Sequence, residues 1–192
     1  MNRHARVKPA KYICDSFAFS VTLTLIFLLY FLRLSRARRI LMCNMEIKGI
    51  DILPHREPFL YLDRIVNCSR EGSVGQVTFG AERDFFRGHF PGYPIVPGVI
   101  LLEAMCQSAA AGVLADRRNR LEANDSATLL FVGADNVRFR RQVRPDEMFE
   151  TQSTVLLLRH GIGKFHVRGS VGGVLSAEAD LTCMEQKESI RC

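Results

Sequence analysis

The chain of 192 residues has no tryptophan, few tyrosines and no pair of cysteines in the C-x-x-C spacing. Without such a pair, the sequence does not predict a structural zinc site. The six cysteines are widely scattered, which indicates free thiols in a reducing compartment rather than a disulfide framework. They are Cys14, Cys43, Cys68, Cys106, Cys183 and Cys192. The chain also has neither an internal repeat nor a low-complexity tract.

The formal net charge of +6 is distributed unevenly along the chain. Residues 1–44 hold eight Lys or Arg residues against a single acid, whereas residues 45–192 hold eighteen bases against nineteen acids. The basic character therefore belongs to the N-terminal segment, and the remainder is a nearly neutral globular domain. This distribution does not argue for a nucleic-acid partner.

The N-terminal segment, residues 1–44, contains seventeen uncharged residues between Asp15 and Arg33. That length is at the lower limit for a helix that spans a membrane. Three interpretations remain open. Residues 16–32 could anchor the protein in a membrane, the segment could be a signal peptide, or translation could begin at Met45. We therefore divide the chain into an extension, residues 1–44, and a domain, residues 45–192. We expect a cytoplasmic protein, with membrane anchoring through residues 16–32 as the alternative.

The domain from residue 45 onward predicts about six strands and one long apolar helix. Two strands, Phe59–Val66 and Gly75–Ala81, precede a helix that begins at Gly98. Four more strands follow, within residues 127–143, 146–161, 163–173 and 174–185. Strands gathered around a single helix indicate an α+β domain in which an antiparallel sheet wraps that helix. A helix that is apolar on all sides needs further cover, so we expect at least a dimer.

The stretch "GHFPGYPIVPGVILLEAMCQ" combines a proline-rich loop with the start of the apolar helix. Pro91, Pro94 and Pro97 prevent regular structure up to Gly98. Glu103 then places a carboxylate on an otherwise apolar helix, where ionised groups are rare unless they are paired or functional.

A histidine and a glutamate at the mouth of an apolar tunnel could carry out an elimination. The amide of Gly98, at the positive end of the helix dipole, could polarise a carbonyl group. His89 could then remove a proton from the adjacent carbon. Desolvation favours a protonated Glu103, which could give its proton to a leaving hydroxyl. Together these groups describe the loss of water from a β-hydroxy carbonyl compound.

Ordinary structural roles also explain these residues. His89 could be a loop hydrogen-bonder, Glu103 could be a buried acid paired with Arg64 or Arg87, and the prolines could only shape a turn. The spacing alone does not choose between these roles and catalysis.

The same string, together with "ILPHREPFLYLDRI" ahead of it, closely resembles the FabZ-type (3R)-hydroxyacyl-[acyl carrier protein] dehydratases. The resemblance covers roughly Ile47 to Thr182, and its core pattern is H-F-P-x-x-P-x-x-P-G-x-x-x-x-E. It implies a hotdog fold, in which a long central helix is wrapped by an antiparallel sheet. It further implies that His89 and Glu103 are catalytic, and that the Gly98 amide binds the thioester carbonyl. A glutamate at this position favours the FabZ type over dehydratase/isomerase relatives, which carry aspartate.

The resemblance also implies that the two catalytic residues of one site come from different subunits, in a dimer or a hexamer built from dimers. The sequence departs from the family pattern at Glu57, Tyr61 and Tyr93. These departures bear on tunnel shape and therefore on the preferred length of the acyl chain.

Four arginines lie within seven residues of the segment "VRFRRQVRP", namely Arg138, Arg140, Arg141 and Arg144. Such a cluster is either a solvated strand end or a docking surface for an acidic carrier protein. His55, in "PHR", is expected to be structural, and His160 and His166 are expected to flank a hairpin.

The sequence thus predicts a lyase that dehydrates (3R)-hydroxyacyl-[acyl carrier protein] to the trans-2-enoyl product in fatty acid biosynthesis, without a metal or an organic cofactor. Lipid A precursor supply is one pathway it could serve. Two alternatives are a hotdog-fold acyl thioesterase and a non-catalytic subunit that binds acyl groups.

Overall fold

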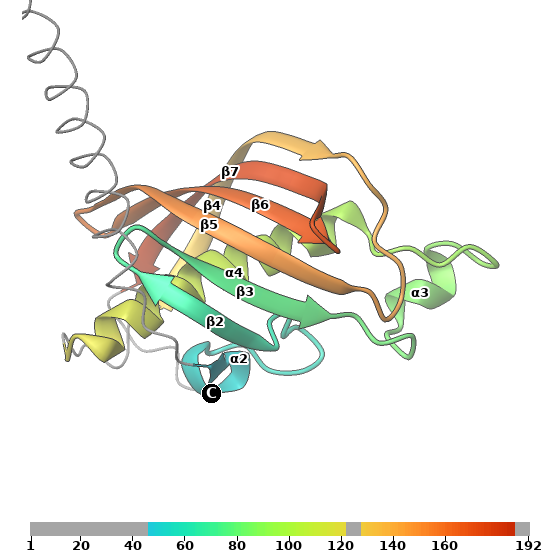
Figure 1. The fold of residues 1–192 in the computed structure, drawn as a ribbon, viewed down its shortest axis with the longest axis horizontal. Helices are drawn as coiled ribbons and strands as arrows, with labels where there is room; N and C mark the ends of the chain where they lie inside the picture. The colour runs from blue at the N-terminus through green and yellow to red at the C-terminus, as the bar shows by residue number, and fades with distance from the viewer. Residues whose placement is uncertain (1–45, 122–127, 187–192) are drawn as a thin grey trace, which may run out of the picture. The chain divides into compact units, whose positions relative to one another are not determined.

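The computed structural model describes residues 46–121 and 128–186, which form one sheet wrapped around one long helix (Figure 1). The three interpretations of residues 1–44 therefore concern a segment outside the described residues. The prediction of an α+β hotdog fold is confirmed.

Seven strands form a single antiparallel sheet in the order β1-β2-β3-β5-β6-β7-β4. The strands are β1 (Ile47–Lys48), β2 (Arg64–Ser69), β3 (Gly72–Thr78), β4 (Thr128–Phe139), β5 (Met148–Arg159), β6 (Ile162–Val171) and β7 (Val174–Gln186). Because β1 has only two residues, the expected count of about six strands is close to what is found. The last four strands agree with their predicted positions.

The helices are α2 (Gly49–Ile52), α3 (Phe85–Gly88) and α4 (Gly98–Asn119). The long helix α4 begins at Gly98, as predicted, and its middle turns are buried against the sheet. Among the described residues, α4 is the one helix long and apolar enough to cross a membrane, and two thirds of its most apolar window is buried within the protein. Burial of that extent is typical of the core helix of a globular domain. The short helix α3 was not predicted.

The first predicted strand was wrong in its position, because Phe59–Asp63 form a loop and β2 begins at Arg64. Its last residue, Asp63, donates from its amide to the carbonyl of Gln76 on β3, but Phe59 and Tyr61 bond to α4. The Gln107 side chain accepts a hydrogen bond from the amide of Tyr61 and donates one to the carbonyl of Phe59, at 2.8 and 3.0 Å. The second strand also starts earlier than predicted, since β3 pairs with β2 from Gly72 onward.

Polar contacts beneath α4 fix the helix closely against the sheet. Thr151 on β5 donates to the hydroxyl of Ser108 on α4, and the hydroxyl of Ser73 on β3 donates to the carbonyl of Ser108 at 3.5 Å. Gly112 faces Ser73 at a separation that leaves no room for a β-carbon. The helix therefore lies at a fixed height and axial position over β3 and β5.

Candidate active site

The first turn of α4 presents backbone amides without a side-chain cap. Pro97 occupies the N-cap position, where its ring cannot accept a hydrogen bond, and its carbonyl accepts from the amides of Ile100 and Leu101. A β-carbon on Gly98 would lie 2.8 Å from the aromatic ring of Phe139 at the end of β4. Glycine is thus required for Phe139 to lie against this turn. The start of α4 retains the donors and the positive dipole end that bind anionic oxygens.

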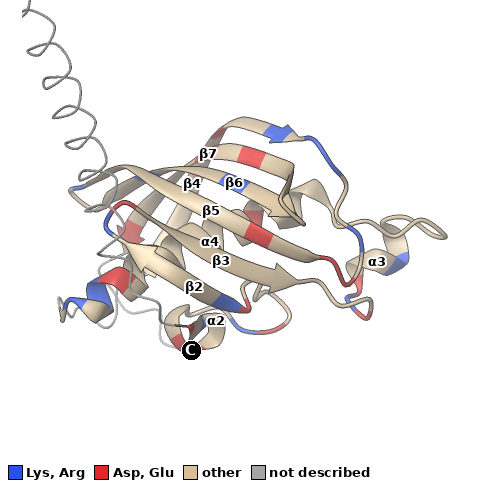
Figure 2. Ribbon diagram, in the orientation of Figure 1, with Lys and Arg blue, Asp and Glu red and all other residues tan. Residues whose placement is uncertain are grey.

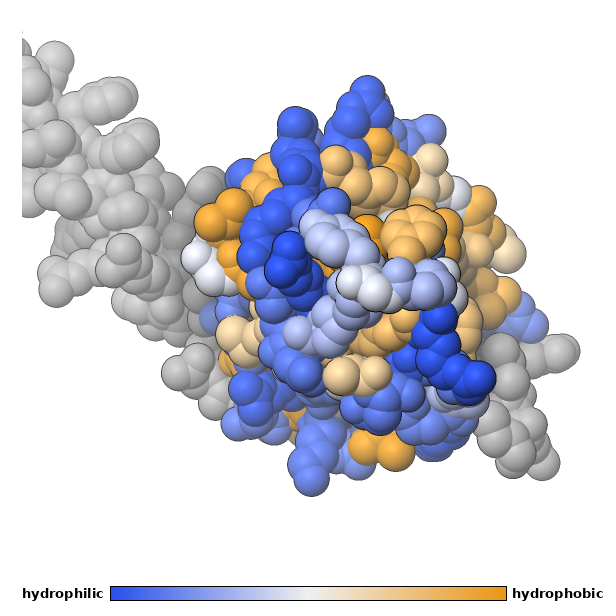
Figure 3. Space-filling view, turned by 90° about the vertical axis from the view of Figure 1, so that its right-hand side faces the viewer, coloured by the Kyte–Doolittle hydropathy of each residue, from blue (hydrophilic) through white to orange (hydrophobic). Residues whose placement is uncertain are grey.

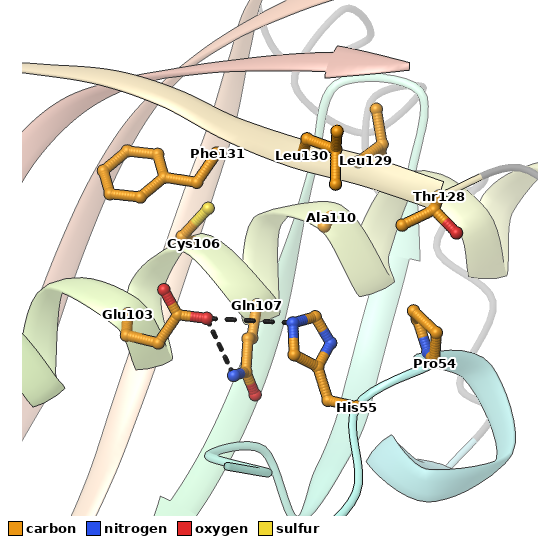
Figure 4. A pocket seen from close by; sticks show the side chains of 10 residues that line it. All are labelled: Pro54, His55, Glu103, Cys106, Gln107, Ala110, Thr128, Leu129, Leu130 and Phe131. Carbon is orange, nitrogen blue, oxygen red and sulfur yellow. Dashed lines mark hydrogen bonds and ion pairs between the residues drawn. The ribbon is translucent and has the colours of Figure 1, made fainter. Parts of the chain in front are cut away.

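Glu103 lies in a pocket between α4, the loop after α2, and the start of β4 (Figure 4). Apolar side chains of β4 form one wall, and the polar groups belong to α4 and the loop. The pocket is lined by Pro54, His55, Glu103, Cys106, Gln107, Ala110, Thr128, Leu129, Leu130 and Phe131. The side chain of Glu103 is 18% exposed, so its carboxyl group can reach a molecule that enters the pocket.

Gln107 fixes one oxygen of that carboxyl group. Its Nε2 donates to Glu103 Oε1 at 2.9 Å, one helical turn away. The amide of Gln107 cannot be reversed, because its Oε1 must accept the hydrogen bond from the Tyr61 amide. Glu103 Oε1 is therefore an acceptor, and a proton carried by this carboxyl group belongs on Oε2, the oxygen without a dashed line in Figure 4.

The suggested pairing of Glu103 with Arg64 or Arg87 is wrong, since neither arginine contacts it. Arg64 is paired with Glu46 at 3.0 Å and Arg87 with Asp84 at 3.4 Å. The charged or polar neighbours of Glu103 are instead Gln107 and His55, whose Nε2 is 3.8 Å from Glu103 Oε1. The expectation that His55 serves only the loop missed this contact, because the two residues are far apart in the sequence.

His89 lies at the C-terminal end of α3, partly buried, at the head of the proline-rich loop. Its Nδ1 is 3.0 Å from the carbonyl oxygen of Ile95, and its own backbone carbonyl accepts from the Ile95 amide at 3.0 Å. A carbonyl can only accept, so Nδ1 carries the proton and Nε2 of the neutral ring keeps its lone pair. In the neutral ring, Nε2 of His89 is thus the nitrogen that can accept a proton.

The structure does not place His89 and Glu103 in one pocket of a single chain. Over the residues that the structure describes, the pocket around Glu103 has no wall from the His89 loop. The end of the molecule that carries α3 is mostly polar with apolar patches (Figure 3). Among its exposed apolar side chains are Phe90, Tyr93 and Val99.

All four clustered arginines have a hydrogen-bond partner among the described residues. Arg140 pairs with Glu178, and Arg141 makes a two-pronged contact with Glu147 at 2.7 and 3.2 Å. The guanidinium of Arg144 lies 5.4 Å from the ring centroid of Tyr93 and donates to its hydroxyl. Arg138 donates to the carbonyl of Val137. Among the described residues, no ion pair joins Arg138 or Arg144 to a carboxylate, unlike Arg140 and Arg141.

Of the family departures, Glu57 forms an ion pair with Arg83 at 2.6 Å, and Tyr61 is buried beside Phe79. Cys106, in the pocket wall, is 3.6 Å from Cys183. That hydrogen bond and burial raise the pKa of the Cys106 thiol, which opposes formation of a reactive thiolate. Among residues 46–121 and 128–186, no group of three or more His, Cys, Asp or Glu side chains is arranged to hold a metal ion.

The comparisons with known proteins agree with this fold. A family model described as a FabA-like domain matches residues 53–180. A solved chain from the dehydratase heterocomplex ApeI:P of Xenorhabdus doucetiae superposes with a TM-score of 0.62 at 24% identity, covering 73% of this chain and 91% of its own. The family match and the fold thus define the class of FabA-like proteins with a hotdog fold.

Curated relatives show which family within the FabA-like class this chain belongs to. The 3-hydroxyacyl-[acyl-carrier-protein] dehydratase FabZ of Desulforamulus reducens is 46% identical over 140 residues, which is 71% of this chain and 94% of that protein. The enzyme of the same name from Acinetobacter baumannii is 36% identical over 144 residues, 74% of this chain and 97% of its own. The chain belongs to the FabZ family, which confirms the resemblance seen in the sequence.

Proposed function

We propose that this protein dehydrates (3R)-hydroxyacyl thioesters on acyl carrier protein to trans-2-enoyl thioesters, in fatty acid biosynthesis. The observation that carries this proposal is the Glu103 carboxyl group, held by Gln107 through one oxygen inside a largely apolar pocket. The named relatives favour a dehydratase over the thioesterase and the non-catalytic alternatives.

In this proposal the base is His89. The Nδ1 proton is directed to the Ile95 carbonyl, so Nε2 is free to take the proton from the carbon next to the thioester carbonyl. Removal of that proton places negative charge on the thioester oxygen. The uncapped amide of Gly98, at the N-terminus of α4, is positioned to stabilise such a charge.

The acid is Glu103, acting through Oε2. As the bond between the β-carbon and its hydroxyl oxygen breaks, the Oε2 proton passes to that oxygen and water leaves. The former C–H electron pair forms the new double bond. Glu103 ends the step as a carboxylate and His89 as an imidazolium, and proton exchange with solvent restores both groups.

The two residues act together only if a second subunit brings its loop to this pocket, so we propose that His89 of the partner subunit faces Glu103. The apolar side chains exposed on the His89 loop and at the start of α4 are suited to such an interface. A dimer is the smallest assembly that meets this requirement, and a hexamer of three dimers is the form that the family resemblance implies. The cytoplasm is the compartment where we place the enzyme.

For the carrier protein, we propose that Arg138 and Arg144 supply the attractive charge. Arg140 and Arg141 already have carboxylate partners, so a docking acidic protein would have to compete with Glu178 and Glu147. Arg138 lies near the end of β4, and the other three arginines lie in the loop toward β5 (Figure 2).

The product of the reaction tests the function directly. A (3R)-hydroxyacyl-carrier protein incubated with the purified protein should lose the mass of one water while the acyl group stays attached. Release of a free acid would instead identify a thioesterase. Binding of the acyl carrier without any change in its mass would identify a non-catalytic subunit.

A further inference from the structure

One polar group in the pocket has no part in the reaction described above. His55 belongs to the loop between α2 and β2, yet its Nε2 faces Glu103 Oε1 across 3.8 Å (Figure 4). The loop is held from behind, because the Arg56 guanidinium donates to the carbonyls of Leu53 and His55 at 2.9 and 2.8 Å. The ring of Phe59 also lies in a stacked arrangement with the imidazole, at a centroid distance of 6.5 Å. The position of His55 is thus set by its own loop.

The surroundings of the imidazole decide where its proton lies. Nδ1 is buried and has no hydrogen-bond partner among the described residues. A buried N–H without an acceptor costs more free energy than a buried lone pair of a weak acceptor, so the proton belongs on Nε2. Burial lowers the pKa of His55, opposed by Glu103 on α4 and reinforced by the adjacent Arg56. The ring is therefore neutral near pH 7 and presents an N–H to the carboxyl group.

We propose that His55 is a positioning residue for Glu103, a second donor that joins Gln107 on Oε1 and holds the catalytic proton on Oε2. This inference rests on the proposed function and deepens it. At 3.8 Å the imidazole is beyond hydrogen-bond distance in the free chain, so Gln107 makes the primary bond.

The contribution of His55 grows during the reaction. When the Oε2 proton passes to the departing hydroxyl oxygen, Glu103 gains a full negative charge in a pocket with an apolar wall. The Nε2–H of His55 then closes on Oε1 and becomes a hydrogen bond to an ion, which is stronger than one to a neutral group. His55 neither gains nor loses a proton, so the atoms and charges of the step are unchanged.

The experiment compares His55→Phe with His55→Gln in the full-length protein. Phenylalanine keeps the ring that packs near Phe59 but has no donor, whereas glutamine carries an amide N–H at about the place of Nε2. We expect His55→Phe to lower kcat by roughly 10- to 100-fold, the usual worth of a hydrogen bond to a charged group, with little change in KM. His55→Gln should recover most of this loss.

The pH profile separates positioning from a merely structural role. The fall of kcat at high pH reports loss of the proton from the acid in the enzyme–substrate complex. Without the donor on Oε1 the carboxylate is less favoured, so in His55→Phe this limb should move to higher pH. The limb at low pH, which reports the base, should stay in place. Thr128→Val is the matched control, because it alters the same pocket without removing a donor to Glu103, and it should move neither limb.

Two outcomes would overturn the proposal while wild-type dehydratase activity stands: equal damage by phenylalanine and glutamine, or a high-pH limb that does not move. If His55→Phe fails to fold, nitrogen-edited NMR of histidine side chains in the wild-type protein gives the decision. The Nε2–H form of His55 at pH 7 supports the proposal, and the Nδ1–H form or an imidazolium contradicts it. Absence of dehydration by the wild type would instead overturn the proposed function itself.

Discussion

The two proposed catalytic groups lie in contrasting surroundings. Glu103 lies within its own chain, on the core helix, where Gln107 links it to the backbone of the loop before β2. The imidazole of His89 bonds to the Ile95 carbonyl and stacks on Phe90, in a loop where Phe90 and Tyr93 are about half exposed. One chain therefore completes the acid half of the site and leaves the base half at its surface. A site shared between subunits requires this difference, because a residue that reaches a partner's pocket must lie at the surface of its own chain.

Removing either group should have the largest effect. His89→Ala and Glu103→Ala should each lower kcat by about two to four orders of magnitude, the usual worth of a positioned proton-transfer group. The double variant should be little worse than either single variant, because the two groups act as a unit. Glu103→Gln should be nearly as damaging as alanine, since it keeps the shape but has no acidic proton. Steady-state kinetics on a soluble hydroxyacyl thioester checks this, with thermal unfolding as the control for folding.

Mixing the two inactive variants tests whether the His89 and the Glu103 of one active site come from different chains. An equimolar mixture of His89→Ala and Glu103→Ala subunits should recover about a quarter of the wild-type activity, because random exchange makes half the dimers mixed and one of their two sites is intact. Native mass spectrometry establishes that exchange has taken place. Verified exchange without recovered activity would show that each site is built within one chain.

Loss of the Gln107 side-chain amide should lower both the stability of the protein and the activity that depends on Glu103. Gln107→Met keeps the volume but leaves the Tyr61 amide and the Phe59 carbonyl without their partner. We expect the free energy of unfolding to fall by about 1–3 kcal/mol and kcat to fall as well. Chemical denaturation and kinetics measure the two losses. Unchanged stability would mean that water replaces Gln107, and that the acid half is less rigid than described.

At the start of α4, Gly98→Ala should force a β-carbon against the ring of Phe139 and cost about 1–3 kcal/mol of stability. Gly88→Ala is the matched control, because a β-carbon at that position meets no atom within 4 Å. Shortening the neighbour, in Gly98→Ala combined with Phe139→Leu, should restore the unfolding midpoint. A failure to restore it would place the cause of the loss elsewhere in the first turn.

The smallest effect on turnover is expected for the surface around Arg138 and Arg144, where we propose that the carrier protein docks. Arg144→Glu and Arg138→Glu should weaken turnover of carrier-bound substrate several-fold at low salt, with the difference fading as ionic strength rises. Turnover of a small thioester without the carrier should not change. Arg159→Glu, at the opposite end of β5, is the control. Equal losses on both substrates would indicate damage to the pocket instead of loss of docking.

Much of the fold could be predicted from the sequence because its elements have local signals. Three prolines before Gly98 locate the start of α4, and alternating residues bounded by glycine locate β5, β6 and β7. The error at Phe59–Asp63 had a non-local cause, since this stretch looks like a strand but Phe59 and Tyr61 bond to Gln107, more than forty positions away.

The candidate site shows the same difference between local sequence signals and contacts made by distant residues. The motif with His89, Gly98 and Glu103 was recognisable as a continuous string, whereas the contact between His55 and Glu103 depends on how a loop is folded onto α4. The tautomer of His89 was likewise out of reach, because the Ile95 carbonyl that sets it is a backbone atom and leaves no trace in residue identity.

The close packing of α4 against β3 and β5 affects how this enzyme could acquire new substrates. With Gly112 against Ser73 and Ser108 bonded to Thr151, the helix cannot shift without loss of these contacts, so the wall that carries the acid tolerates little variation. The facing wall belongs to β4, an edge strand paired only with β7 and interrupted by a bulge after Phe131. We expect descendants of this protein, natural or selected in the laboratory, to change their acyl range through Leu129, Leu130 and Phe131, while the chemistry on the opposite wall is inherited unaltered.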